Sequence, residues 1–299
     1  MKDRGLLYGV AAYTLWGVLP IYWKLLQGVP TSEILVHRII WSLVFLLLLL
    51  ALRRQWSWII PLRRAPRTLA ILATAAALLV VNWFTYIWGV NSGLIVETSL
   101  GYFINPLVNV LLGVLLLHER MRPGQWIAVS VAGAGVLYLT LSYGSLPWIA
   151  LILAFTFGFY GLLKKKVPLG PIQSQSAEMA ILFFPALTYL VLLFNNNQAS
   201  FGQSSLLTTV LLVASGAVTA IPLLLFAAAA QRIPLSTIGI LQYIAPTMQF
   251  LIGVFIYGEV FTTERLIGFC IIWIALLIYT LESLFYNKPI KSGEMAIKS

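Results

Sequence analysis

Charged residues are scarce in this sequence. Asp, Glu, Lys and Arg together make up 9% of the 299 residues, whereas about a quarter of the residues in soluble globular domains are charged. Hydrophobic residues make up 60%. A soluble fold of this size cannot bury so much apolar surface, and the apolar runs repeatedly approach the roughly 20 residues that a membrane helix needs. The composition therefore excludes an ordinary soluble domain and predicts an integral membrane protein.

Residues that carry redox and metal chemistry are also scarce. The single cysteine, Cys270, excludes a disulfide within the chain, and two histidines far apart, His37 and His118, make a poor metal site. No phosphate-binding P-loop pattern occurs, and the apolar stretches contain neither a His/Asp cluster nor a GxSxG turn. We therefore expect no cofactor, no metal and no enzymatic activity.

The positive charge has a pattern of its own. Lys and Arg number 19 against 9 acidic residues, and they gather in connections on one side of successive apolar stretches, such as Arg53 to Arg67 and Lys164 to Lys166. This bias is the one that the positive-inside rule describes, so the basic residues do not indicate a nucleic-acid partner. We expect a multi-pass protein of the inner (plasma) membrane, surrounded by the lipid bilayer, with both termini in the cytoplasm.

Ten apolar stretches of helical length follow one another along the chain. Their hydrophobic residues and flanking turns predict an all-α integral membrane protein with ten transmembrane helices. The expected helices cover residues 5–24, 34–52, 69–90, 96–117, 124–142, 146–163, 174–194, 206–229, 236–257 and 265–285.

An internal repeat with an offset of 140 residues divides these helices into two sets of five. Pro106, Gly113 and Glu119 recur as Pro246, Gly253 and Glu259. Because five is odd, the second half enters the membrane from the opposite face, so the halves form an inverted repeat. We expect one repeat at 1–142, a second at 143–287 and a cytoplasmic tail at 288–299. Inverted repeats are a common plan of secondary transporters.

Several segments carry a family resemblance. The sequences "AAYTLWGVLPIYWK", "EILVHRIIWS", "NWFTYIWGVN", "SLGYFINPLVN" and "LSTIGILQYIAPTMQFLIGV" resemble the RarD subfamily of EamA-type permeases, in the drug/metabolite transporter superfamily. The resemblance covers nearly the whole chain. It implies a ten-helix bundle with cytoplasmic termini, a central cavity between the halves, and export or exchange of small metabolites or drugs.

The expected helix 96–117 contains candidate substrate-binding residues. Asn105 and Asn109 are four residues apart and share a helix face. Pro106 removes the helical hydrogen bond to the carbonyl of Tyr102. A loosened backbone beside two amides suits a polar solute. The alternative is that the amides bond a neighbouring helix and Pro106 provides a packing kink.

The repeat-related helix 236–257 offers a matching set. Gln242 and Gln249 are seven residues apart on one face, and Tyr243 follows Gln242. We expect the two proline-containing helices to meet near the pseudo-twofold axis and to bound the substrate site together.

The expected helix 69–90 adds Asn82 and Tyr86, again four residues apart. Trp83 on this helix and Trp23 on the first helix supply aromatic surface, which suits an amphipathic or cationic solute. Aromatic residues that simply pack or anchor the helices at the interface are the alternative.

Titratable residues stand near helix ends. His37 and Arg38 follow Glu33 by four and five residues, and the repeat places Glu178 opposite His37. Such groups suit gates or a proton relay, because imidazole changes charge near neutral pH. The alternative is a surface Glu33, a snorkelling Arg38 and an interfacial Glu178.

These features favour a secondary active transporter that moves small metabolites or drugs, such as amino acids or related amphipathic solutes, by alternating access. A proton or solute gradient would drive it. A non-transporting sensor or assembly subunit is the alternative, and a membrane-embedded enzyme is a further one. The sequence indicates neither the substrate nor an oligomeric state.

Overall fold

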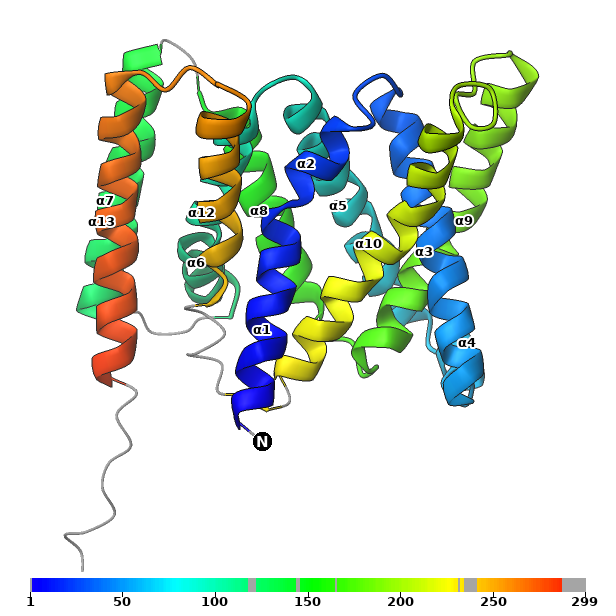
Figure 1. Ribbon diagram of the computed structural model, residues 1–299. Helices are drawn as coiled ribbons and strands as arrows, with labels where there is room; N and C mark the ends of the chain where they lie inside the picture. The colour runs from blue at the N-terminus through cyan, green and yellow to red at the C-terminus, as the bar shows by residue number, and fades with distance from the viewer. Residues whose placement is uncertain are drawn as a thin grey trace, which may run out of the picture.

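The computed structural model describes residues 2–117, 122–143, 146–164, 166–230, 232–233 and 241–286. This part of the chain is helical and contains no strand. Its helices run mostly along one common direction and lie side by side (Figure 1). They are α1 (Lys2–Gly17), α2 (Leu19–Lys24), α3 (Thr31–Arg53), α4 (Ile59–Arg63), α5 (Pro66–Asn91), α6 (Ile95–Leu117), α7 (Pro123–Tyr143), α8 (Trp148–Lys164), α9 (Pro171–Asn195), α10 (Leu206–Ala230), α12 (Ile244–Leu251), the π-helix η1 (Ile252–Ile256) and α13 (Thr263–Tyr286).

Seven helical segments of the described chain are long and apolar enough to cross a membrane. They are Arg4–Lys24, Thr31–Arg53, Pro66–Asn91, Pro123–Ser142, Pro171–Asn195, Leu206–Phe226 and Thr263–Glu282. The protein is therefore a multi-pass membrane protein, as the composition predicts. Helices stand at all ten predicted positions, although the predicted helix 236–257 is described only from residue 241.

The first predicted helix, 5–24, is divided into α1 and α2 around Val18. Pro20 causes this break, because proline has no N–H to donate to the carbonyl of Trp16 four residues earlier. The freed carbonyl accepts a hydrogen bond from Nε2 of Gln249 in α12, at 3.1 Å. The break in the first helix is thus satisfied by a side chain from far along the chain.

Close helix contacts depend on small residues. A Cβ atom added to Gly216 of α10 would lie 2.3 Å from the carbonyl carbon of Trp41 in α3. One added to Gly101 of α6 would lie 2.8 Å from the carbonyl oxygen of Ala150 in α8. These glycines allow the backbones of α3 with α10, and of α6 with α8, to approach directly.

The helices form a bundle with an outlying pair. Helices α7 and α13 pack along each other at one edge, and α6 lies between this pair and α8 (Figure 1). Helix α3 packs against α9 and α10, and α5 packs against α8. Helices α3, α5 and α6 contribute the buried polar groups that are described next.

Candidate functional site

Arg38 of α3 is buried in the bundle, with 5% of its surface exposed. Its Nε donates to the Thr219 hydroxyl of α10 at 2.8 Å. The guanidinium carbon lies 3.8 Å from the ring centre of Trp83 and 5.1 Å from that of Trp23. The rings that the sequence suggested for a cationic solute therefore contact the protein's own cation. Since the head group lies between indole rings, it does not snorkel to the surface.

Three tyrosines stand near the same guanidinium. Tyr22, Tyr86 and Tyr102 interact electrostatically with Arg38, and the rings of Tyr86 and Tyr102 meet edge to face at 5.6 Å. The Tyr22 hydroxyl donates to the carbonyl of Leu211. The Tyr86 hydroxyl is buried and has no hydrogen-bond partner among the residues that the structure describes. Two predicted substrate residues, Tyr86 and Tyr102, thus meet beside the predicted gating residue Arg38.

The α6 amides lie one turn and two turns beyond Tyr102. Asn109 Nδ2 donates to Asn105 Oδ1 at 2.9 Å, so the two amides share one face, as their spacing predicts, and also bond each other. Asn105 is buried and Asn109 is exposed. The Asn109 side chain lies beside Gly158 of α8, where an added Cβ would approach its oxygen to 3.3 Å. Tyr102 and the two amides thus follow one another along α6 at helical spacing.

Three other predicted residues have partners within the bundle. Asn82 Nδ2 donates to the Leu153 carbonyl and to the Thr156 hydroxyl of α8, both at 3.0 Å. Gln249 donates to the broken first helix, as described above. The Tyr243 ring packs against the apolar cluster between α6, α7 and α13. Gln242 precedes it and is partly buried.

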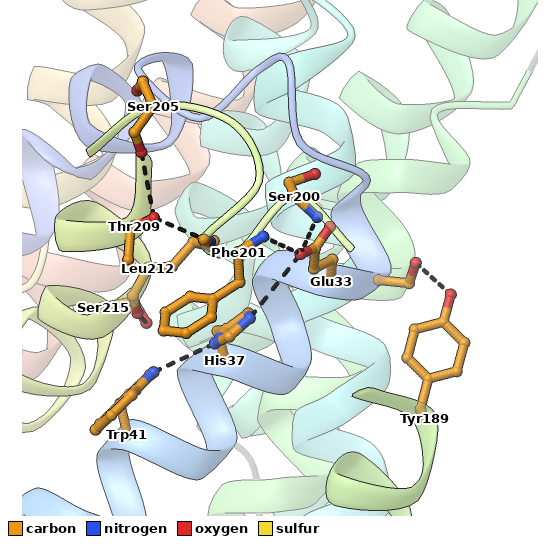
Figure 2. A network of polar contacts seen from close by, with 12 residues as sticks. Glu33, His37, Trp41, Tyr189, Ser200, Phe201, Ser205, Thr209, Leu212 and Ser215 are labelled. Atoms are coloured by element: carbon orange, nitrogen blue, oxygen red, sulfur yellow. Dashed lines mark hydrogen bonds and ion pairs between the residues drawn. The ribbon is translucent and has the colours of Figure 1, made fainter. Parts of the chain in front are cut away.

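Glu33 and His37 form a network at the start of α3 (Figure 2). Glu33 Oε1 accepts the backbone N–H groups of Ser200 and Phe201, at 2.7 and 3.0 Å, so it fixes the connection between α9 and α10. His37 stacks on the Phe201 ring at 4.7 Å. Trp41 Nε1 donates to His37 Nδ1 at 3.2 Å, and His37 Nε2 lies 4.0 Å from Glu33. Glu33 is fully buried, so the alternative of a surface carboxylate is wrong.

Glu178 forms a second polar network, between α8 and α9. Its Oε1 accepts from Lys164 Nζ at 2.6 Å, and its Oε2 accepts from the Tyr160 hydroxyl at 3.1 Å. Ser174 contributes a further bond to Glu178, at 3.3 Å. Glu178 is fully buried, so the interfacial alternative is wrong here too. Helix α9 begins at the end of the bundle opposite to the start of α3, so the two networks lie far apart (Figure 1).

Glu259, one of the residues of the internal repeat, is a carboxylate with a structural role. Its two oxygens accept the backbone N–H groups of Ile95 and Val96, at 2.7 and 2.8 Å, at the start of α6. Burial raises the pKa of this carboxyl, and the two N–H groups oppose the rise. Glu259 therefore ties the connection before α13 to the N-terminus of α6.

Sequence reasoning missed the contact partners of Arg38. Thr219 carries no signal in the sequence, because isolated threonines are common in membrane helices. The sequence predicted Trp23 and Trp83 as aromatic surface for a solute, and not as contacts of Arg38. The available signal was the placement of one arginine about seven residues inside a long apolar helix, where an ionised group needs partners from other helices.

The chain matches known proteins along nearly its whole length. The model of the EamA-like transporter family matches residues 3–141. "Protein RarD" of Streptomyces exfoliatus is 50% identical, over 95% of this chain and 90% of the relative. "Uncharacterized transporter YojE" of Bacillus subtilis is 45% identical, over 97% of each chain. A solved crystal structure with 18% identity has the same fold, with a TM-score of 0.60 over 94% of this chain and 99% of that chain.

Several apolar helices, a polar interior and these relatives define a membrane transporter of the drug/metabolite type. Within that class, the chain belongs to the RarD subfamily of the EamA-like transporter family.

Proposed function

We propose that the protein is a secondary active transporter of small organic solutes, working by alternating access. Its ten helices span the cell membrane as two inverted repeats, 1–142 and 143–287, and both termini, with the tail 288–299, are cytoplasmic. The 140-residue repeat and the charge pattern of the connections support this arrangement.

One observation carries the proposal: polar side chains from α3, α5 and α6 gather deep inside a protein of the transporter class. Arg38, Tyr86 and Asn105 are all buried, and unpaired polar groups in a bilayer are costly. Such groups are retained where they bind a solute. Tyr102, Asn109 and Gln242 extend the proposed substrate site, and Asn82, Tyr243 and Gln249 hold its helices in place.

The two distant networks are the proposed gates. The Glu33–His37 network closes one end of the bundle, and the Lys164–Glu178 network closes the other. In alternating access one network opens while the other stays closed, so the solute is never in contact with both sides. The first network joins α3 to the connection between α9 and α10, and the second joins α8 to α9, each by few hydrogen bonds.

A flux assay tests the transport function. The purified protein is reconstituted in liposomes, and exchange of labelled amino acids, amines and nucleosides is measured with and without an imposed proton gradient. We expect saturable exchange of at least one solute class. Asn105→Ala should reduce the initial rate at least tenfold while leaving the amount of inserted protein unchanged. Asn196→Ala, in the connection after α9, serves as the matched control and should retain the wild-type rate.

Absence of flux for every solute class would contradict a transporter and favour a sensor or assembly subunit. A flux that responds to the proton gradient in the wild type but not in His37→Ala would assign coupling to the Glu33–His37 network. Flux that is independent of the gradient would exclude proton coupling.

A further inference from the structure

Arg38 has no acidic partner among the described residues. Three ion pairs join described side chains, and none of them includes Arg38. Glu33, five residues before Arg38, accepts the Ser200 and Phe201 amides through Oε1 and forms no ion pair with Arg38, and Glu178, near the other end of the bundle, binds Lys164. The Nη1 group of Arg38 is buried with no hydrogen-bond partner in this part of the chain.

The described residues that contact Arg38 are neutral: two indole rings and one hydroxyl. Cation–π attraction and a hydrogen bond to a neutral hydroxyl stabilise the guanidinium but supply no opposite charge. Removing an ionised group from water into a protein interior costs several kcal/mol even after relaxation. A guanidinium stays charged at any physiological pH, so it cannot escape this cost by losing its proton. An anion is the missing compensation.

Unused hydrogen-bond donors gather around the same place. Besides Arg38 Nη1, the Trp23 Nε1 group and the Tyr86 hydroxyl are buried and lack partners among the described residues. Arginine and tryptophan side chains donate only. The surroundings of Arg38 therefore hold an excess of donors beside aromatic ring faces. Such a set complements a ligand that accepts hydrogen bonds and carries a flat apolar body.

Arg38 also lies at a depth in the bundle that suits a solute-binding site. It follows the start of α3 by seven residues, and Tyr102 follows the start of α6 by seven, which places both about 10 Å inside the helix ends at 1.5 Å per residue. A solute bound there is inside the bundle, beyond the Glu33 network. The described contacts of Arg38 include no second basic residue, so its single positive charge suits a ligand with a single negative charge.

We propose that Arg38 binds the carboxylate of the transported solute, which is a monoanion with an aromatic or flat apolar body. This inference rests on the proposed transport function and assigns its substrate class. The guanidinium and the Tyr86 hydroxyl donate to the carboxylate oxygens, and the rings of Trp83 and Tyr102 contact the apolar body. Amines and neutral amides of the same shape are rejected, because they leave the buried cation unpaired.

Matched ligands test the proposal without requiring transport. Thermal unfolding of the purified, detergent-solubilised protein is followed with benzoate, phenylacetate, 3-phenylpropionate and indole-3-acetate, each beside its primary amide, and with phenethylamine. A ligand that binds only the folded state raises the melting temperature. We expect at least one carboxylate to raise the melting temperature at about 10 mM or below, a concentration that suits a dissociation constant in the millimolar range. The corresponding amide and the amine should leave the melting temperature unchanged. If no carboxylate raises the melting temperature, or amides raise it equally, the proposal is wrong.

Substitutions identify the residue that responds. Arg38→Met should weaken carboxylate binding about 10- to 100-fold, the range for a lost charged hydrogen bond. Without ligand it should unfold at or above the wild-type temperature, because the unpaired charge is gone. Arg122→Met is the control: Arg122 pairs with Glu282 at 2.8 Å, so its loss should lower the melting temperature and leave carboxylate binding unchanged.

If Arg38→Met does not fold, Tyr86→Phe provides the second variant and should weaken carboxylate binding several-fold. Carboxylate binding that persists in Arg38→Met or in Tyr86→Phe would overturn the assignment. The experiments distinguish a wrong transport function from a wrong substrate class. Carboxylate binding without flux in liposomes would overturn the transport function alone. Flux restricted to amines or neutral solutes would overturn the substrate class alone.

Discussion

At the scale of single residues, two of the helix amides differ in what they bond. Asn82 is buried and links α5 to a backbone carbonyl and a hydroxyl of α8, whereas Asn109 is exposed and bonds Asn105 on its own helix. Side-chain hydrogen bonds between membrane helices average about 0.6 kcal/mol each. Asn82 is thus suited to holding two helices together, and Asn109 is free to bind a solute.

Asn82→Ala should therefore lower the free energy of unfolding by roughly 1 to 2 kcal/mol, from two lost hydrogen bonds and a small cavity. Unfolding of the purified protein by heat or denaturant measures the change. Asn109→Ala is the matched control and should change stability by less than about 0.5 kcal/mol while reducing flux. The opposite pattern, with flux reduced and stability unchanged in Asn82→Ala, would place Asn82 in the substrate site.

The sequence predicted which site residues lie next to each other on one helix, but not which residues of other helices they contact. Spacing of four residues correctly indicated that Asn105 and Asn109 share a face, and that Glu33 and His37 lie together. The partners of Arg38 come from α2, α5 and α10, more than ten residues away in every case. No periodicity within one helix specifies which neighbour it will contact, so these partners required the structure.

At the scale of helices, boundaries followed from apolar length and from proline. The predicted helix 69–90 is α5, Pro66–Asn91, and 206–229 is α10, Leu206–Ala230. The break at Val18 and the short helix α4 were not predicted. Pro20 falls within an apolar run, and a proline in such a run can either kink a helix or end it. The amino-acid composition is the same in both cases, so the sequence does not distinguish them. The deciding factor is Gln249, which satisfies the carbonyl that the proline leaves free.

The contact between α3 and α10 gives a prediction about glycine. Gly216→Ala adds a methyl group that would lie 2.3 Å from a backbone carbon of Trp41, which cannot move like a flexible side chain. We expect α10 to shift away from α3, with a loss of about 1 to 3 kcal/mol of stability. Because Arg38 and Thr219 bridge these helices, the shift should also weaken solute binding. Thermal unfolding and flux measure the two effects.

Gly133 of α7 is the matched control for that substitution. No atom of the described residues lies within 4 Å of a Cβ added there, so Gly133→Ala should leave stability unchanged or raise it by up to about 1 kcal/mol through helix propensity. Equal effects of both substitutions would show that the close contact at Gly216 is not important for stability.

At the scale of the whole molecule, the proposed mechanism depends on how the halves are oriented. Helix α9 has 25 residues and so extends about 37 Å, enough to cross the bilayer from the connection at Lys166 to that at Asn196. Helix α9 begins at the end of the bundle where α1 begins and ends at the opposite end (Figure 1). The proposed orientation has the basic end in the cytoplasm, because of the charge pattern of the connections.

The chain offers a direct way to test this orientation, because it contains one cysteine. In a Cys270→Ala background, Asn196→Cys should react with a membrane-impermeant maleimide in intact cells. Lys166→Cys should react only after the membrane is permeabilised. Both positions are exposed, so a lack of labelling cannot result from burial. Labelling of both from the same side would mean that α9 does not cross the bilayer. The Glu33–His37 and Lys164–Glu178 networks would then face one compartment, and they could not act as alternating gates.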